Sequence, residues 1–162
     1  MSSKIRNEDL SIYFFIKDLL AGKVSNVIDS YPYTDIMNDK LTIPTVAIEH
    51  RQTEDMRGVG ELGSSWFRRS WVINVFAETD TKRDDIAELI FNSLDIPVPI
   101  RDYSLGYRKE TGKSLLGTDL RIIEYVQPED RTVRPIYTFN DLNKLKYWQT
   151  AISFSTISTQ AV

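Results

Sequence analysis

The chain has 162 residues, of which 41% are hydrophobic and 27% charged, and its 20 basic and 23 acidic side chains give a net charge of −3. This composition is typical of one globular domain, and the sequence shows neither an apolar run long enough to span a membrane nor the features of a secretion signal. It has no cysteine, which excludes disulfides, thiolate metal sites and cysteine nucleophiles, and the acidic balance argues against a general nucleic-acid binder.

The N-terminal part of the chain predicts a helix over residues 8–21. Asn7 is a favourable N-cap, and Glu8 and Asp9 place negative charge in the first turn, where the helix dipole favours it. The apolar positions that follow recur with helical spacing. Gly22 can adopt the left-handed conformation that ends many helices.

The next segments predict extended chain and a hairpin. Residues 27–28 predict a short strand, and the Tyr-Pro-Tyr sequence at 31–33 predicts extended chain because proline restricts the residue before it. Alternating apolar residues predict a strand over 45–51. Residues 52–63 are polar and contain three glycines, so the simplest connection to the next strand is a long hairpin covering residues 45–78.

A long strand followed directly by a helix is the clearest pattern in the sequence. Residues 64–78 are rich in β-branched and aromatic side chains, and we expect one alternating set to face the helices, namely Phe67, Arg69, Trp71, Ile73, Val75 and Ala77. We expect the first half of this strand, with Arg68 and Arg69, to project beyond the core. Thr79 or Asp80 caps a helix that runs to about Leu94.

The remaining chain predicts short strands, loops and one long final strand. These elements are a strand at 100–104, a loop at 105–117, a strand at 118–126, a turn at 128–130, a strand or extended arm at 131–139, a turn at 140–143 and a strand at 146–158. The whole pattern predicts a single α+β domain over residues 1–162, with a mostly antiparallel sheet, two main helices on one face and a long β-hairpin. The hairpin at 45–78 is expected to project, and residues 95–146 form a possible extended insertion.

Two glycine-containing strings resemble nucleotide-binding motifs but lack the required context. Residues 58–63 read G-x-G-x-x-G, yet strand-like residues follow them where a dinucleotide site needs a helix. Gly112, Lys113 and Ser114 end like a P-loop, but the spacing from Gly106 is wrong. We therefore interpret both strings as loops and expect no cofactor.

Catalytic and metal-binding patterns are absent from the sequence. His50 is the only histidine, and it is better explained as a structural residue at a strand end. Pairs of adjacent carboxylates occur only where solvation or a helix dipole explains them. We expect no metal site and no catalytic residue. Arg68 and Arg69 lie among aromatic residues, a pattern that suits single-stranded nucleic acid or, more readily, a protein interface.

The layout resembles the tail terminator, or tail completion, family of tailed bacteriophages, which joins tail to head. The resemblance is carried by the N-terminal helix at 8–21, the strand LTIPTVAIEHR with its glycine-containing loop, the unit SWVINVFAETDTKRDDIAELIFNSL and the closing strand KYWQTAISFST. It is a resemblance of element order, and the longer segment at 95–146 departs from it.

The resemblance implies a virion structural protein and not an enzyme. Proteins of this family form a homo-oligomeric, hexameric ring in the neck of the virion, assembled in the host cytoplasm, which caps the tail tube protein and contacts the head connector or stopper protein. DNA passes the channel without specific binding, and no membrane is involved. We expect interface residues near the hairpin tip: Arg57, Gly58, Gly60, Glu61, Gly63, Trp66, Arg68 and Arg69.

Two alternatives stay open at this point. The chain could be a small cytosolic enzyme whose site is built from dispersed carboxylates and tyrosines, which a deep cleft with convergent polar groups would favour. It could also be a nucleic-acid-binding module, which a steep salt dependence of DNA binding would favour.

Overall fold

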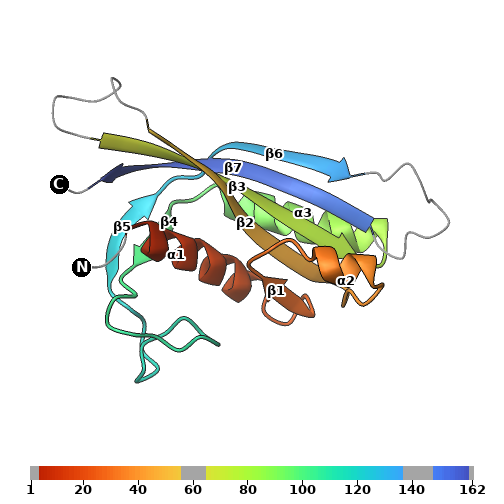
Figure 1. Ribbon diagram of the computed structural model, residues 1–162, viewed down its shortest axis with the longest axis horizontal. Coiled ribbons are helices and arrows are strands. Elements are labelled where there is room, and N and C mark those ends of the chain that lie inside the picture. The colour runs from red at the N-terminus through yellow and green to blue at the C-terminus, as the bar shows by residue number, and fades with distance from the viewer. Residues whose placement is uncertain (1–3, 56–64, 137–147, 161–162) are drawn as a thin grey trace.

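The computed structural model describes residues 4–55, 65–136 and 148–160, and its main feature is one long, twisted sheet (Figure 1). The sheet has the strand order β1-β2-β3-β7-β6, and every neighbouring pair is antiparallel except β1 with β2. A second sheet pairs β4 with β5. The strands are β1 (Asn26–Ile28), β2 (Thr45–Asp55), β3 (Ser65–Ala77), β4 (Val98–Arg101), β5 (Ile122–Val126), β6 (Glu129–Ile136) and β7 (Trp148–Gln160).

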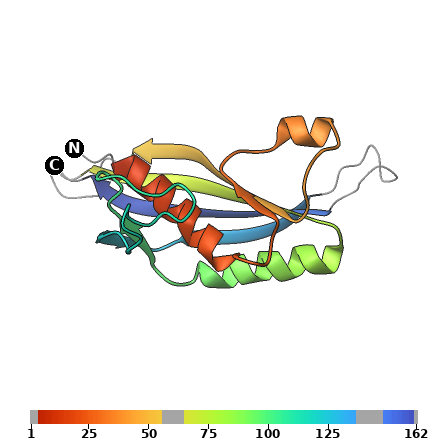
Figure 2. The ribbon, with the colours of Figure 1, turned by 90° about the horizontal axis from the view of Figure 1, so that it is seen from below.

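The two long helices, α1 (Lys4–Leu19) and α3 (Asp80–Ser93), pack against the same face of the long sheet, while the short helix α2 (Tyr33–Met37) lies on the other side (Figure 2). The opposite face is covered near α2 by Tyr31, whose ring packs 5.7 Å from that of Phe76. The predicted α+β class, with a mostly antiparallel sheet, two main helices and a long hairpin, is confirmed.

The core forms where the alternation of β3 meets the apolar stripes of the helices. Trp71, Ile73 and Val75 point to the helices and are at most 2% exposed. They pack in one cluster with Ile12 of α1 and Ile90 of α3, both completely buried. The predicted inward face of this strand is therefore confirmed, and burial of such apolar surface is the main force that holds helices to a sheet.

The helix that follows β3 begins as the sequence predicts. Thr79 has extended backbone angles and its hydroxyl accepts a hydrogen bond from the Lys82 backbone N–H at 3.1 Å, which is an N-cap. The start predicted for α1 is wrong. Asn7 lies inside the helix, which begins at Lys4, and its side-chain oxygen accepts from the Tyr103 backbone N–H at 3.0 Å.

Several element boundaries differ from the sequence prediction because proline and tertiary contacts decide them. Pro32 precedes a short helix, α2, where extended chain was expected, and its carbonyl accepts from the Ile36 N–H at 3.0 Å. The expected turn at 128–130 instead begins β6, which pairs with β7. β2 is four residues longer than predicted, β4 lies at 98–101 and β5 is shortened to 122–126. The turn at 140–143 lies outside the described residues.

Candidate functional site

Three strands reach the hairpin end of the long sheet together. β2 pairs with β3 as far as Asp55 opposite Phe67, and β3 pairs with β7 as far as Ser65 opposite Gln160. Figure 1 shows these strand ends side by side, next to the N-terminal end of α1. The backbone of Trp66 is part of β3, opposite Thr159. The other tip candidates, Arg57, Gly58, Gly60, Glu61 and Gly63, lie outside the described residues.

The two neighbouring arginines of β3 have opposite environments, because successive strand residues point to opposite faces. The Arg68 side chain is 38% exposed and lies 3.8 Å from the carboxylate of Asp130, which is itself exposed. The Arg69 side chain is only 1% exposed. The expectation that Arg69 projects beyond the core is therefore wrong, and Arg68 is the arginine available to a partner.

Arg69 is buried because the first turns of α1 cover this part of β3. Its Nη1 lies 3.6 Å from Glu8 Oε2 and donates to the Ile5 carbonyl at 3.4 Å, and its Nη2 donates to Asp9. The guanidinium carbon also lies 4.8 Å from the centre of the Trp71 ring. A buried cation is tolerated only with such partners, so this ion cluster fixes α1 on the sheet.

The cluster extends to β7 through a buried threonine. The Thr156 hydroxyl donates to Glu8 Oε1 and accepts from Trp71 Nε1 at 3.3 Å. The sequence did not predict this network. Arg69 nevertheless belongs to the alternating set of β3 that was expected to face the helices, and Glu8 and Asp9 are acidic residues in the first turn of the predicted helix. That combination was the available signal, because an inward arginine needs an inward carboxylate.

His50 lies at the edge of the same region on β2. Its Nε2 is 3.0 Å from the Gln52 carbonyl oxygen and 3.0 Å from the Thr53 hydroxyl, and its ring packs 5.2 Å from that of Trp71. Burial lowers the pKa of His50, and the positive charge of Arg69 lowers it further. His50 lies inside β2, not at a strand end as expected, and its ring is held by these contacts.

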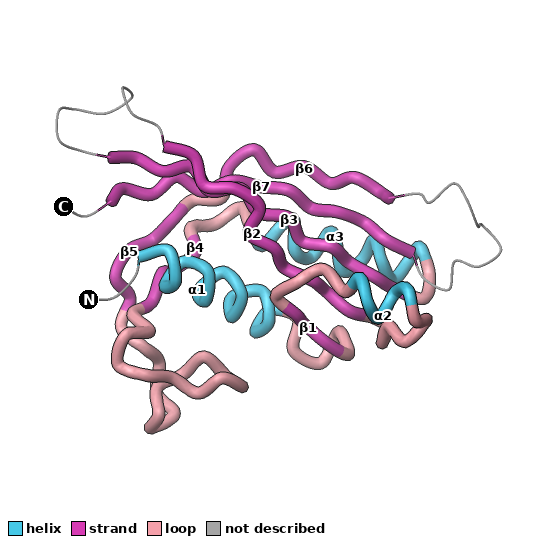
Figure 3. Tube along the Cα trace, viewed as in Figure 1, coloured by secondary structure: helices cyan, strands magenta, loops and turns pink. Residues whose placement is uncertain are grey.

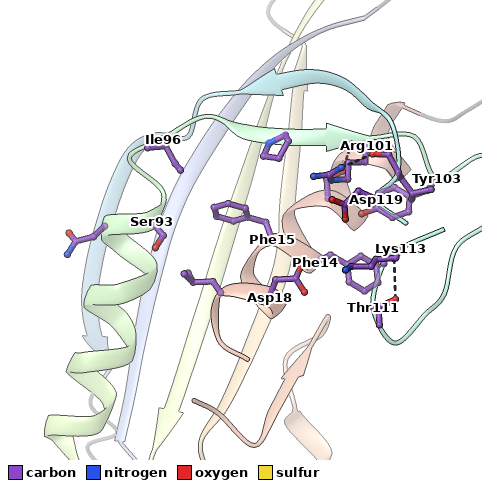
Figure 4. A pocket seen from close by; sticks show the side chains of 16 residues that line it. Phe14, Phe15, Asp18, Ser93, Ile96, Arg101, Tyr103, Thr111, Lys113 and Asp119 are labelled. Carbon is purple, nitrogen blue, oxygen red and sulfur yellow. Dashed lines mark hydrogen bonds between the residues drawn. The ribbon is translucent and has the colours of Figure 1, made fainter. Parts of the chain in front are cut away.

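A cavity of about 480 Å³ lies between α1, the end of α3, β4 and the loop at 102–121 (Figure 4). Its size suits a small ligand. Its two serines are engaged with the backbone: Ser93 Oγ donates to the Leu89 carbonyl at 2.7 Å, and Ser11 Oγ accepts from the Arg101 N–H at 2.9 Å.

Titratable side chains from several segments line this cavity. Burial raises the pKa of the Asp18 carboxyl, partly offset by the nearby cations Lys113 and Lys17. Burial also raises the pKa of Tyr103 to about 12. Asp18, Lys113 and Asp119 lie on different segments around an apolar floor.

The described residues also bear on the remaining motifs of the sequence. Within the described residues, no group of three or more His, Cys, Asp or Glu side chains could hold a metal ion. A strand, β3, follows the G-x-G-x-x-G string, so no helix is placed to meet a dinucleotide phosphate. Gly112 to Ser114 lie in a loop in which the Ser114 N–H donates to the Thr118 carbonyl at 2.8 Å. Among the helices of the described chain, none has the length and apolarity to cross a membrane.

Comparison with known proteins gives matches among solved structures but none by sequence. No protein-family model matches the sequence, and no curated protein matches it. Among solved structures, the fold is similar to a chain of the virion of a native gene transfer agent (GTA) particle, with a TM-score of 0.43 and 9% sequence identity. The similarity covers 93% of this chain and 94% of that chain.

Proposed function

We propose that this chain is a structural protein of a tailed-phage virion, which forms a ring that terminates the tail tube and joins it to the head connector. The observation that carries the proposal is the open end of the long sheet. β1 pairs with β2 only from Thr45 to Ala47, so the outer edge of β2 from Ile48 to Asp55 has no strand partner among the described residues. An open strand edge can accept backbone hydrogen bonds from another chain.

The charge of the chain fits a ring through which DNA passes. A net charge of −3 repels phosphate and disfavours the counterion release that drives non-specific DNA binding. A closed ring requires two different, complementary surfaces on each subunit. One surface binds the preceding copy and the other binds the following copy, and the same rotation relates each copy to the next. The hairpin end then remains for the tail tube, where Arg68 can bind an acidic partner.

The proposal assigns no catalytic step to the chain. The one histidine is held by Gln52 and Thr53, and the serines of the 480 Å³ cavity are bonded to the backbone. A structural role therefore accounts for these three side chains without a reaction.

Binding to tail tubes tests the proposal directly. Purified protein is mixed with assembled tubes of candidate tail tube proteins, and co-sedimentation and electron microscopy measure whether it binds at one tube end as a ring. Replacing residues 56–64 by a short Asn-Gly turn is expected to abolish binding, while Thr132→Ser on β6 serves as the matched surface control. Failure to bind any tube end, together with a monomeric mass in light scattering, would refute the proposal.

A further inference from the structure

The loop at 102–121 connects β4 to β5 and extends away from the two sheets (Figure 3). It carries three exposed leucines. Leu105, Leu115 and Leu116 are 87%, 61% and 90% exposed. Gly106, the neighbour of Leu105, lies beside Leu115, because a Cβ added at Gly106 would stand 3.5 Å from the Leu115 side chain. Single exposed leucines are common, whereas a contiguous group marks a surface that another molecule covers.

The loop holds these leucines in a fixed arrangement. Arg108 donates to the Leu115 carbonyl from Nε at 3.1 Å and from Nη2 at 2.9 Å, and its backbone N–H donates to the Lys113 carbonyl at 2.8 Å. Gly112, with φ of +71°, lies so close to Phe14 that a Cβ there would be 2.5 Å from the ring. A loop ordered before contact loses little conformational entropy when it binds.

A complementary surface lies at the other end of the molecule, along the start of α3 (Figures 1 and 2). A hollow of about 610 Å³ lies between α3 and the residues that follow α1; Ile86 and Leu89 give it an apolar wall, and its polar lining includes Lys23, Lys82 and Asp85. The outward side chains of this segment are mainly acidic: Glu78, Asp80, Asp84, Asp85 and Glu88 are all exposed. A partly apolar hollow beside these exposed carboxylates suits an apolar knob that carries basic residues.

The charges of the two surfaces have opposite sign. Residues 105–117 carry three cations, Arg108, Lys109 and Lys113, and one carboxylate, a net charge of +2. Residues 78–88 carry five carboxylates and two cations, a net charge of −3. Complementary charge selects and orients partners even where it adds little affinity.

We propose that the leucine loop of one copy of this chain binds the α3 hollow of a second copy. Because the two surfaces lie at opposite ends of the molecule, the contact is head-to-tail, and repeated contacts close a ring or extend a filament. The inference deepens the proposed function, since it supplies the copy-to-copy contact that a ring needs and leaves the hairpin end free for the tail tube.

Engineered cysteines test the contact, since the chain has none of its own. One copy carries Leu116→Cys, the other carries Asp85→Cys on α3, and the mixed proteins are oxidised mildly. We expect a disulfide-linked heterodimer at several times the yield obtained when the second copy carries Thr132→Cys on the exposed strand β6. Equal yields from the two pairs would overturn the proposal, and so would a preference for linkage between two Leu116→Cys copies, which indicates a two-fold contact.

Self-association gives a second, independent measurement. Leu115→Ser with Leu116→Ser is expected to weaken association roughly tenfold or more in sedimentation velocity, as the loss of two buried leucines predicts. Mixing this loop variant with the Asp84→Lys, Asp85→Lys variant is expected to give heterodimers that neither forms alone, because one intact contact remains. An unchanged mass for both variants, or no heterodimer, would overturn the contact. Binding to tail tubes is scored separately, so tube capping without this contact would reject the inference and keep the proposed function.

Discussion

Replacing Arg69 with methionine should destabilise the protein strongly. The substitution keeps most of the apolar stem but removes a cation that is 1% exposed and that neutralises Glu8, itself 2% exposed. It also removes the hydrogen bonds to Asp9 and to the Ile5 carbonyl. Breaking a buried ion pair by removing one partner costs about 3–5 kcal/mol, because the other charge remains buried without compensation.

Urea unfolding followed by tryptophan fluorescence measures this loss. Against a total stability of about 5–15 kcal/mol, a loss of this size leaves a folded but much weakened protein. With a urea slope of about 2 kcal/mol per molar, the midpoint should fall by about 2 M. Trp71 reports directly, because its ring lies 4.8 Å from the Arg69 guanidinium carbon.

Arg68→Met is the matched control one residue away. Its ion pair with Asp130 spans 3.8 Å between side chains that are 38% and 72% exposed, and such surface pairs contribute about 0–1 kcal/mol. Adding Glu8→Gln to Arg69→Met should recover part of the loss by removing the uncompensated charge. A loss below about 1 kcal/mol for Arg69→Met, or equal losses at both arginines, would refute the assignment of a buried ion cluster.

Three further predictions concern the surroundings of α1. Gly112→Ala should cost about 1–3 kcal/mol and speed proteolysis of the 102–121 loop, because its Cβ would meet the Phe14 ring at 2.5 Å; an unchanged cleavage rate would contradict this packing. The single histidine should titrate below 6.5 by NMR, as the lowered pKa of His50 requires, and a value at or above 6.5 would show it solvated. Burial raises the pKa of the Asp18 carboxyl, so its ionisation weakens the fold as pH rises above 3.8. Asp18→Asn should therefore stabilise the protein at pH 7 and not at pH 3. Equal dependence of the unfolding free energy on pH in the two proteins would exclude this.

The strand-to-helix unit could be predicted because its signals are local. The apolar alternation of β3 and the capping threonine before α3 are both visible within a few residues, and both are confirmed. The start of α1 could not be predicted in this way. Asn7 and Glu8 have the residue types of a helix cap, but their side chains bind Tyr103 and Thr156, which are 96 and 148 residues away in sequence.

The surroundings of the site also depend on distant contacts. The loop at 105–117 was predicted as loop, yet its order comes from Phe14 of α1, which packs 6.0 Å from Tyr103 and 6.1 Å from Tyr107 between ring centres. Aromatic contacts of this kind hold a loop that has little regular structure of its own. The assignments for residues 56–64 stay predictions, because the structure does not describe them.

The buried cluster and the hairpin end are parts of one strand, which connects stability to the proposed function. β3 runs without interruption from Ser65 to Arg69, and β7 runs beside it from Thr156 to Gln160. Arg69 and Thr156 are both anchored to Glu8 of α1, so the cluster fixes both strands a few residues before the end that we propose binds the tail tube. An interface that is already ordered before binding loses less conformational entropy when it binds. Arg69→Met should therefore weaken tube binding even at temperatures where the variant remains folded, while Arg68→Met should affect only the direct charge contact.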